Sequence, residues 1–513
     1  MDNFLKYFAQ DIGNIFHEFL NIFKSVFDFF LSIFDIGSRI DAIERNGAEF
    51  NLWEWILFII SNLILLAIIV LLVILAVKYG KKLFRFRAPI KELDEAEKKI
   101  KELQRELIKS NYEKDRILSM KLGGMDNAQL DDETAVAVNQ NRNSVDSPCV
   151  DPATSRFFRL TTVDNYYKEV YVCPEYDNEI TLDQFCDKFR AFAASQLHLY
   201  YDIKLIRHFV ASMGAVRIII LQGISGTGKT SLPYAFGKFV SNDSTVVSVQ
   251  PAWRERTELY GYFNEFTSKY TETEFLRAIY EANYIRDPGI VILDEMNIAR
   301  VEYYFAEMLS ILEMPIESEW KVGITSAVWD NDPCLIEDGK VKIPHNVWFV
   351  GTINNDDSTF AVADKVYDRA IPIDLDSRAA AFEEEKEPSI RVSTDHLREM
   401  FEQAKINYPV SEEILEKLEL VNAYLIKNFH LAFGNRIMKQ LKDYVPCYVA
   451  CGGTELEAVD FIVAKKVLRK FESLSLDFMK EDLNNFITYL DRTFGKENMT
   501  VCKEYINYLK RMG

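Results

Sequence analysis

Eight residues from Gly223 to Thr230 have the types and spacing of a loop that binds phosphate. They read Gly-Ile-Ser-Gly-Thr-Gly-Lys-Thr, follow the apolar run 216–221 and match the pattern G-x-x-x-x-G-K-[ST]. Glycines let main-chain N–H groups close around phosphate oxygens, because a side chain would block that approach. The lysine of such a loop reaches the β- and γ-phosphates, and the threonine hydroxyl is a ligand for Mg²⁺. We predict a nucleotide site made of Gly223, Ser225, Gly226, Thr227, Gly228, Lys229, Thr230 and Ser231, with Thr230 also a metal ligand.

Two carboxylates follow a second apolar run. Residues 290–293 read Ile-Val-Ile-Leu, and Asp294 and Glu295 come directly after them. A run of this kind is typical of a strand buried on both faces, so both carboxylates are expected at the carboxyl end of a parallel strand. We predict that Asp294 holds Mg²⁺ and that Glu295 polarises the water that attacks the terminal phosphate.

Asparagines follow a third apolar run, 347–352. A polar side chain at the end of the strand beside the carboxylates is needed to orient that water. We predict Asn354 for this role, with Asn355 as the alternative. An asparagine that merely caps the strand end in a turn is the other interpretation.

Two arginines complete the candidate catalytic set. Arg369 precedes the apolar run 370–375, the place from which ring-forming NTPases present an arginine to the neighbouring subunit. Arg436 opens a helical segment and is predicted to contact phosphate from a helical lid. A surface arginine and a structural ion pair, respectively, are the alternatives.

The elements that must position these residues are five short strands separated by helical segments. The strands are expected at 216–221, 245–249, 290–293, 347–352 and 371–375. This alternation predicts an α/β fold, a doubly wound parallel sheet with nucleotide at the carboxyl ends of the strands. Helical periodicity after residue 395 predicts a C-terminal α-helical lid.

The first part of the chain has the composition of a membrane anchor. From Ile56 to Val77 no residue is charged, and a helix of that length measures ~33 Å, enough to cross a bilayer core. Residues 1–54 carry four basic and nine acidic side chains, whereas lysines and arginines crowd 78–87. We therefore predict a single-pass inner-membrane protein with its N-terminus outside and its nucleotide domain in the cytoplasm. Phenylalanines spaced three to four apart before residue 36 predict an amphipathic helix.

Charge and cysteine content narrow the class of protein. The 513 residues carry 60 Lys plus Arg against 78 Asp plus Glu, a net charge of −18, which argues against direct nucleic-acid binding. Seven scattered cysteines without a C-x-x-C pair indicate reduced intracellular thiols. After Pro89, apolar residues on heptad positions predict either a short coiled coil or a solvated single helix. Residues 156–180 are expected to form a small strand or hairpin.

Four stretches in this order resemble the McrB-like branch of the AAA+ ATPases: GISGTGKT, LDEMNIARVEYYFAEMLSILE, WFVGTINNDDSTF and FGNRIMKQL. The resemblance covers about residues 180–475. It implies a homo-oligomeric ring, usually a hexamer, with nucleotide at each subunit interface and a partner effector protein, nuclease-like in the prototype. It also implies a β-hairpin within 316–345, where Asp338-Gly339 suits the turn.

Together these features predict a membrane-anchored, ring-forming AAA+ NTPase that hydrolyses ATP, or GTP as the alternative, with Mg²⁺ as cofactor. It would drive conformational work on a partner, with anti-phage defence as the setting. A MoxR-like chaperone or remodelling ATPase, and a catalytically weak, nucleotide-switched scaffold, are the other hypotheses. The predicted parts are an amphipathic segment (1–50), a transmembrane helix (53–79), a coiled-coil stalk (88–120), a flexible linker (121–155), the α/β nucleotide-binding domain (180–385) and the α-helical lid with C-terminal helices (386–513).

Overall fold

The computed structural model describes residues 51–122, 151–354, 359–376, 379–473 and 479–512, with six single positions before residue 51. The predictions for the amphipathic segment, for residues 123–150 of the linker and for Asn355 lie outside the described residues. The chain divides into two compact units, Met1–Glu102 and Leu103–Gly513, and each is described by itself.

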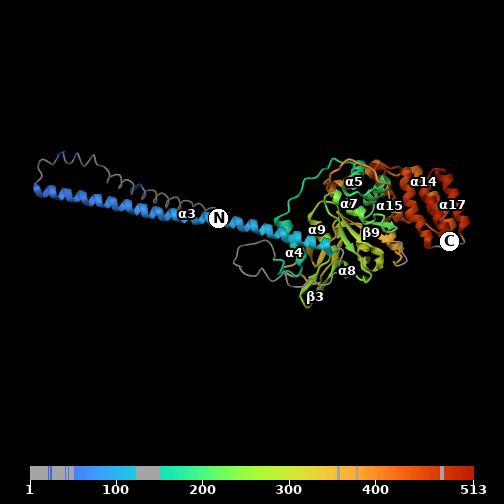
Figure 1. The fold of residues 1–513 in the computed structure, drawn as a ribbon, viewed down its shortest axis with the longest axis horizontal. Helices are drawn as coiled ribbons and strands as arrows, with labels where there is room; N and C mark the ends of the chain where they lie inside the picture. The colour runs from blue at the N-terminus through green and yellow to red at the C-terminus, as the bar shows by residue number, and fades with distance from the viewer. Residues whose placement is uncertain are drawn as a thin grey trace, which may run out of the picture. The chain divides into compact units, whose positions relative to one another are not determined.

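One helix, α3 (Leu52–Leu122), contains the apolar run of the first unit (Figure 1). Its segment Leu52–Tyr79 has 28 residues and a mean hydropathy of 3.2, and none of its most apolar stretch is buried against the rest of the protein. By length and composition this segment is able to cross a membrane, since a bilayer core needs ~20 apolar residues. The prediction of a single long apolar helix at 53–79 is confirmed; its insertion in a membrane remains a proposal.

The coiled coil predicted for 88–120 is not confirmed. Residues of the expected heptad face are more than half exposed, at 54% for Ile100, 58% for Leu103, 53% for Leu107 and 53% for Ile117. The helix runs through this stretch without a break. What the structure shows is a helix whose apolar stripe lies open.

The residues of α3 from Leu103 onwards belong to the second unit, and the face opposite the apolar stripe packs within that unit. Tyr112 is 4% exposed and stacks on Tyr166 of α4 (Phe158–Glu169), with ring centroids 3.8 Å apart. The hydroxyls of Tyr112 and Tyr167 both donate to Glu281 at the end of α9 (Glu274–Glu281). Helix α4 stands where a strand or hairpin was expected at 156–180, so that prediction is wrong.

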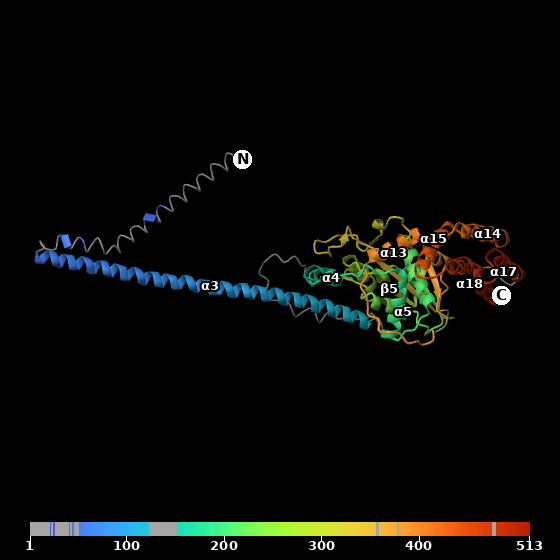
Figure 2. The same cartoon turned by 90° about the horizontal axis from the view of Figure 1, so that it is seen from above.

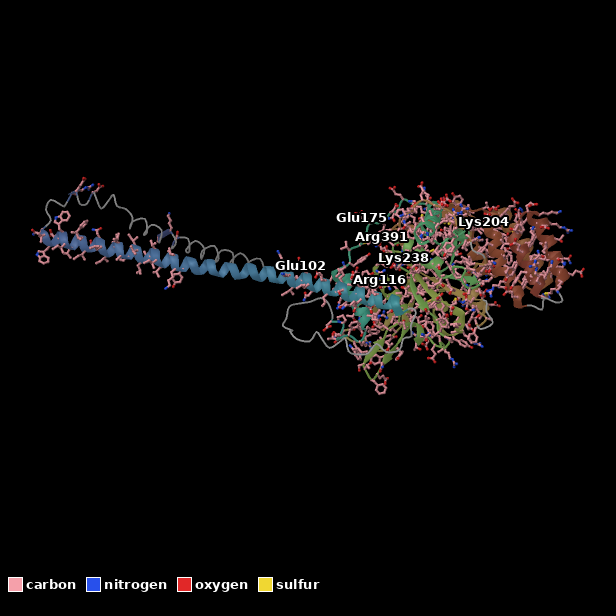
Figure 3. The ribbon with its side chains drawn as sticks, viewed as in Figure 1. Glu102, Arg116, Glu175, Lys204, Lys238 and Arg391 are labelled. Carbon is pink, nitrogen blue, oxygen red and sulfur yellow. The ribbon has the colours of Figure 1, made fainter. Side chains whose placement is uncertain are left out.

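Ion pairs extend this contact on both sides. Asp115 accepts from Arg159 of α4 at 3.1 Å. Arg116 pairs with Asp243 at 3.0 Å, and Lys238 of α7 (Ser231–Phe239) reaches the same carboxylate at 2.8 Å. Arg116 and Lys238 are labelled in Figure 3. The polar face of the predicted stalk is therefore a docking face.

The second unit is built on a five-stranded parallel sheet in the order β10-β1-β9-β5-β2. Its strands are β1 (Ile218–Gly223), β2 (Thr245–Ser248), β5 (Gly289–Asp294), β9 (Val347–Asn354) and β10 (Ala370–Asp374). All five predicted strands are confirmed, and the fold is α/β. The strands read as continuous apolar runs because both faces of a parallel sheet are covered.

Alternate residues of the strands belong to two apolar cores. Ile219 and Leu221 of β1 pack with α5 (Leu182–Leu197), α6 (Ile203–Ala215) and α7. Ile218 and Ile220 pack on the other face with α4, α8 (Thr257–Tyr260) and α9. Helix α10 (Val301–Tyr304) joins this second core through Tyr304, and helix α11 (Ala306–Ile311) joins it through Met308.

Two small antiparallel sheets interrupt the α/β pattern. The hairpin β3 (Tyr262–Asn264) and β4 (Lys269–Thr271) was not predicted. Strands β6 (Lys321–Gly323), β7 (Ile336–Glu337) and β8 (Lys340–Lys342) form the expected insertion. Its turn is at Asp338-Gly339, where a Cβ on Gly339 would lie 2.0 Å from the Thr325 carbonyl oxygen. The predicted hairpin turn is confirmed.

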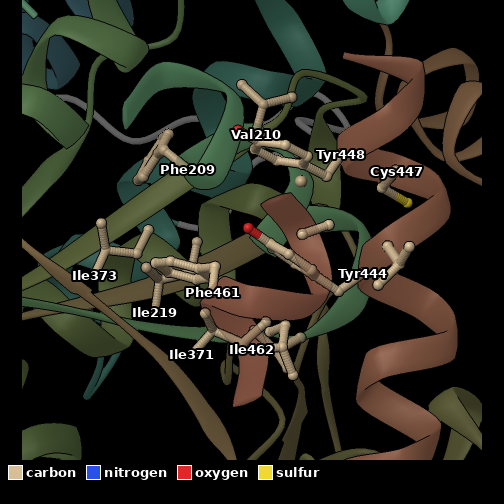
Figure 4. Packing of buried hydrophobic residues seen from close by; sticks show 14 of the residues in the cluster. Phe209, Val210, Ile219, Ile371, Ile373, Tyr444, Cys447, Tyr448, Phe461 and Ile462 are labelled. Atoms are coloured by element: carbon tan, nitrogen blue, oxygen red, sulfur yellow. The ribbon is translucent and has the colours of Figure 1, made fainter. Parts of the chain in front are cut away.

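A helical lid follows the sheet, as predicted, and its helices α14, α15 and α17 lie together in both views (Figures 1 and 2). Before it, the short α12 (Asp364–Tyr367) leads into β10. The lid helices are α13 (Thr394–Asn407), α14 (Glu412–Phe429), α15 (Asn435–Ala450), α16 (Glu455–Ile462), a π-helical turn (Val463–Val467), α17 (Lys480–Phe494) and α18 (Thr500–Met512). Tyr444 and Phe461 of the lid share one apolar cluster with Ile371 of β10 (Figure 4).

Candidate functional site

The predicted phosphate loop connects β1 to α7 and depends on its glycines. Gly223, Gly226 and Gly228 have φ angles of 144°, 79° and 95°, which favour glycine. At Gly223 an added Cβ would also lie 2.5 Å from the Leu375 carbonyl oxygen, after β10. Ser225 and Gly226 are exposed at the crest of the loop, and Ser231 begins α7. The N-terminus of α7 thus adjoins the loop, which suits an anion.

Lys229 lies inside this loop, with only 7% of it exposed. Its Nζ donates to the carbonyl oxygens of Gly223 at 3.0 Å and of Ile224 at 2.7 Å. Thr227 Oγ1 also donates to Ile224 O, at 2.9 Å. The hydroxyl of Tyr201 donates to Gly228 O at 3.4 Å, and burial raises the pKa of this hydroxyl well above its usual range, so that it stays a donor. These bonds tie the main chain of the loop to the Lys229 ammonium group, to Thr227 and to Tyr201.

The predicted metal ligands meet where β5 ends. Thr230 Oγ1 donates to Asp294 Oδ1 at 2.7 Å, and Thr352 Oγ1 donates to the same oxygen at 2.8 Å. Thr352 in turn accepts from the main-chain N–H of Glu295 at 2.8 Å. The sequence reasoning missed Thr352, although it stands two residues before Asn354 in the same strand. Its hydroxyl fixes both carboxylate residues at once.

Glu295 and Asn354 face each other across the ends of β5 and β9. Asn354 Nδ2 donates to Glu295 Oε1 at 3.4 Å, while Asn297 Nδ2 donates to the Asn354 carbonyl oxygen at 2.9 Å. Glu295 is exposed and has a left-handed backbone, with φ 51° and ψ 46°. Strained backbone of this kind costs about 1–3 kcal/mol and clusters at functional sites.

Arg369 and Arg436 come together at a residue that was not predicted, Glu313, shortly after α11. Arg369 Nη2 lies 2.6 Å from Glu313 Oε2, and its Nη1 donates to Lys365 O at 2.5 Å. Arg436 pairs with the other oxygen of the same carboxylate. In the described part of the chain, the two arginines therefore form ion pairs with one and the same carboxylate, that of Glu313. No sequence signal marks Glu313, because it is one of many glutamates in the chain.

Acidic groups also line the β10 side of the loop. Asp376 Oδ1 is 3.2 Å from the position of a Cβ on Gly223. Burial raises the pKa of the Asp376 carboxyl, and the charge of Asp374 adds to this. Asp374 accepts from Gln222 Nε2 at 2.6 Å. The end of β1, where the loop begins, is thereby tied to the end of β10.

No protein-family model and no curated protein sequence matches the chain. Among solved structures, it is similar to a candidate ATPase from Cytophaga hutchinsonii, with a TM-score of 0.41 and 12% identity over 64% of this chain and 96% of that one. It is also similar to a full-length MCM homolog from Methanopyrus kandleri, with a TM-score of 0.31 and 13% identity over 57% of this chain and 61% of that one. An assignment of function therefore rests on the geometry of the site.

Proposed function

We propose that this chain is a Mg²⁺-dependent nucleoside-triphosphate hydrolase of the AAA+ class that uses ATP, with GTP as the alternative. The observation that carries the proposal is the joining of Thr230, Asp294 and Thr352 through one carboxylate oxygen beside the Lys229 loop. Glu295 and Asn354 lie at the same edge of the sheet. Phosphate binding, metal binding and water activation thus have separate groups in one place.

The residues present fit a nucleotide with Mg²⁺. A hydroxyl and a carboxylate are the hard oxygen ligands that Mg²⁺ takes in small number beside phosphates. Bound Mg²⁺ would neutralise charge on the phosphate oxygens. The glycine backbone of the loop leaves room for those oxygens, and Lys229 supplies a buried positive charge to them.

Glu295 accepts the proton of the attacking water in this proposal, and Asn354 orients the same water. A carboxylate within hydrogen-bond reach of the water is what general-base catalysis needs. The bond from the Thr352 hydroxyl to the Glu295 N–H fixes the backbone from which the carboxylate extends. Asn297 fixes the backbone of Asn354 in the same way.

Arg369 acts at the interface between subunits of a ring, which we propose to be a hexamer, and Arg436 contacts phosphate from the helical lid. Their two guanidinium groups, 20% and 45% exposed, are gathered on one edge and suit a charged nucleotide. An arginine supplied in trans stabilises the negative charge of the transition state and is worth ~10³–10⁵ in rate. The carboxylate of Glu313 holds both groups at that edge.

Membrane attachment and a partner complete the proposal. The exposed apolar segment Leu52–Tyr79 supports a single span, and the basic residues after it support a cytoplasmic nucleotide domain at the inner membrane. The McrB-like motifs support a partner effector protein, nuclease-like, and a role in anti-phage defence. A reporter fused after Gly513 should be cytoplasmic, and a periplasmic signal would contradict this topology.

The test of the enzyme is the substitution Glu295→Gln in the full-length protein. We expect hydrolysis of ATP to fall below detection while ATP binding and assembly persist, because only the base is lost. The matched control is Glu258→Gln, at an exposed glutamate of α8, which should keep wild-type turnover. A wild type that shows no turnover of ATP or GTP, with or without a partner, would favour the scaffold hypothesis.

A further inference from the structure

Two consecutive lysines of the lid are buried. Lys465 is 8% exposed and Lys466 is 4% exposed, and both stand in the π-helical turn Val463–Val467. Lysine is almost never fully buried unless it is paired. The partners of these two ammonium groups therefore decide what the turn does.

Lys466 holds the backbone that carries Arg369. Its Nζ donates to three carbonyl oxygens, those of Tyr367 at 2.5 Å, Asp368 at 3.1 Å and Ala370 at 2.7 Å. An ammonium group has three donors, so these bonds use all of them. The three carbonyls stand on both sides of residue 369. One lid side chain thus fixes the turn between α12 and β10 from which the Arg369 side chain extends.

A second lid residue supports the same turn. Gln440 Nε2, on the helix α15 that begins beside Arg436, donates to Asp368 O at 3.1 Å. The neighbouring Lys465 reaches the other end of β10, where it pairs with Asp374. Lys465 and Lys466 are alike in burial and in position on the chain but differ in target. Lys465 is therefore a matched control for Lys466.

The surroundings of Lys466 favour a role in hydrogen bonding over charge pairing. Its bonded acceptors are main-chain carbonyls, and burial lowers the pKa of this ammonium to about 7. Asp368 is the acidic group whose charge favours the ammonium, whereas Arg436, Arg469 and Lys470 oppose it. Keeping a lysine at such a position is costly unless the bonds it makes are needed.

We propose that Lys466 is a positioning residue for Arg369. Through Lys466, the position of the lid sets the position of the arginine that is presented to the neighbouring subunit. This inference rests on the proposed function, because it needs Arg369 to act in trans. The lid and β10 share one apolar cluster (Figure 4), and the bonds of Lys466 join the π turn directly to the turn before β10. A displacement of the lid then reaches Arg369 through the three carbonyls.

Replacing Lys466 with methionine keeps most of its length and removes the donors. The carbonyls of the turn would then lose their partner in a buried place, and the turn should shift toward water. A misplacement of about 1 Å at a catalytic group can cost about 100-fold in rate. We therefore expect Lys466→Met to lower hydrolysis by about 100-fold, with nucleotide binding and assembly unchanged.

The decisive measurement uses mixed rings of the full-length protein in detergent, with ATP and Mg²⁺. Lys466→Met subunits are mixed with Glu295→Gln subunits, which keep an intact Arg369, or with Arg369→Ala subunits, which do not. The first mixture should recover hydrolysis at hybrid interfaces, up to about a quarter of all interfaces in random rings. The second mixture should stay inactive. Lys465→Met subunits, by contrast, should restore hydrolysis to Arg369→Ala subunits, because Lys465 pairs with Asp374 and its loss leaves the three bonds of Lys466 in place.

Each outcome separates the inference from the proposed function. No recovery when Arg369→Ala and Glu295→Gln subunits are mixed would remove the trans role of Arg369 itself. Suppose instead that hydrolysis recovers in that mixture and that Lys466→Met subunits also restore hydrolysis to Arg369→Ala subunits. This result would overturn the positioning role of Lys466 and leave the trans role of Arg369 intact. If Lys466→Met does not fold, Gln440→Met removes one bond to the same turn. It should show a several-fold loss and the same pattern of rescue, and the opposite pattern would overturn the inference.

Discussion

The two sides of the sheet build their chemistry in different ways. At the centre, the groups that act on the subunit's own nucleotide stand at the ends of β1, β5 and β9, and they bond to one another directly. At the β10 edge, Arg369 is held by Glu313 before it in the chain and by lid residues about a hundred positions after it. Strand register positions the first set, whereas packing between distant elements positions the second. The second set is joined to the lid by hydrogen bonds.

The largest effect expected at the β10 edge is that of Arg369→Ala. Hydrolysis should fall by about 10³-fold or more, because the transition state loses a charge supplied in trans. The affinity for ATP, measured by titration of a fluorescent analogue, should stay the same. Lys365→Ala, one turn earlier on α12, is the control. A parallel loss of affinity would place Arg369 in the ground-state binding site and weaken the contrast between the two sides.

At the centre of the sheet, Asn354→Ala should lower kcat by about 100-fold, the lower end of the range for a group that acts on proton transfer. KM should hardly change, since the Asn354 side chain donates to Glu295. Steady-state kinetics with Mg²⁺ in excess measures both constants. A rise in KM with constant kcat would reassign Asn354 to nucleotide binding.

Stability against pH tests the burial of Lys466. Its pKa in the folded protein is about 7, below the ~10.4 of an unfolded lysine. Between these values the unfolded chain binds the extra proton, so the free energy of unfolding rises with pH. Relative to Lys466→Met, wild type should gain about 2–3 kcal/mol from pH 7 to pH 9, and only about 0.4 kcal/mol from pH 6 to pH 7. Denaturant unfolding of both proteins at these pH values measures the difference, and parallel curves would mean that Lys466 is solvated.

The smallest expected effect is that of Thr352→Val, which keeps the shape of the side chain and removes its hydroxyl. Asp294 and the Glu295 N–H each lose one bond, and a single bond is worth about 1 kcal/mol. Hydrolysis should fall about tenfold, and half-saturation should need more Mg²⁺. Thr352→Ser should restore most of both, whereas an unaltered Mg²⁺ dependence would separate Thr352 from the metal site.

The sequence was sufficient for the sheet and for the centre of the site. Four of its strands, β1, β5, β9 and β10, are almost wholly buried and appear as apolar runs, and Lys229, Asp294 and Glu295 adjoin the ends of such runs. Contacts that depend on the mutual placement of distant helices were not predictable. Lys466 has the sequence appearance of a surface lysine, and Tyr112 that of an exposed stalk residue, yet both are 4% exposed.

The π-helical turn at Val463–Val467 has a consequence for how related chains should be compared. Consecutive side chains of a regular α-helix point about 100° apart. A π turn holds one residue more than an α-helical turn, because its hydrogen bonds join residues five positions apart instead of four. Deleting any one of these five residues would shorten the connection between α16 and Leu468 and so change the direction of everything from Leu468 onwards relative to β10. A relative that kept both lysines but lacked one residue here would therefore retain every chemical group and lose their alignment. When related chains are aligned, the number of residues in this segment is therefore more informative than their types.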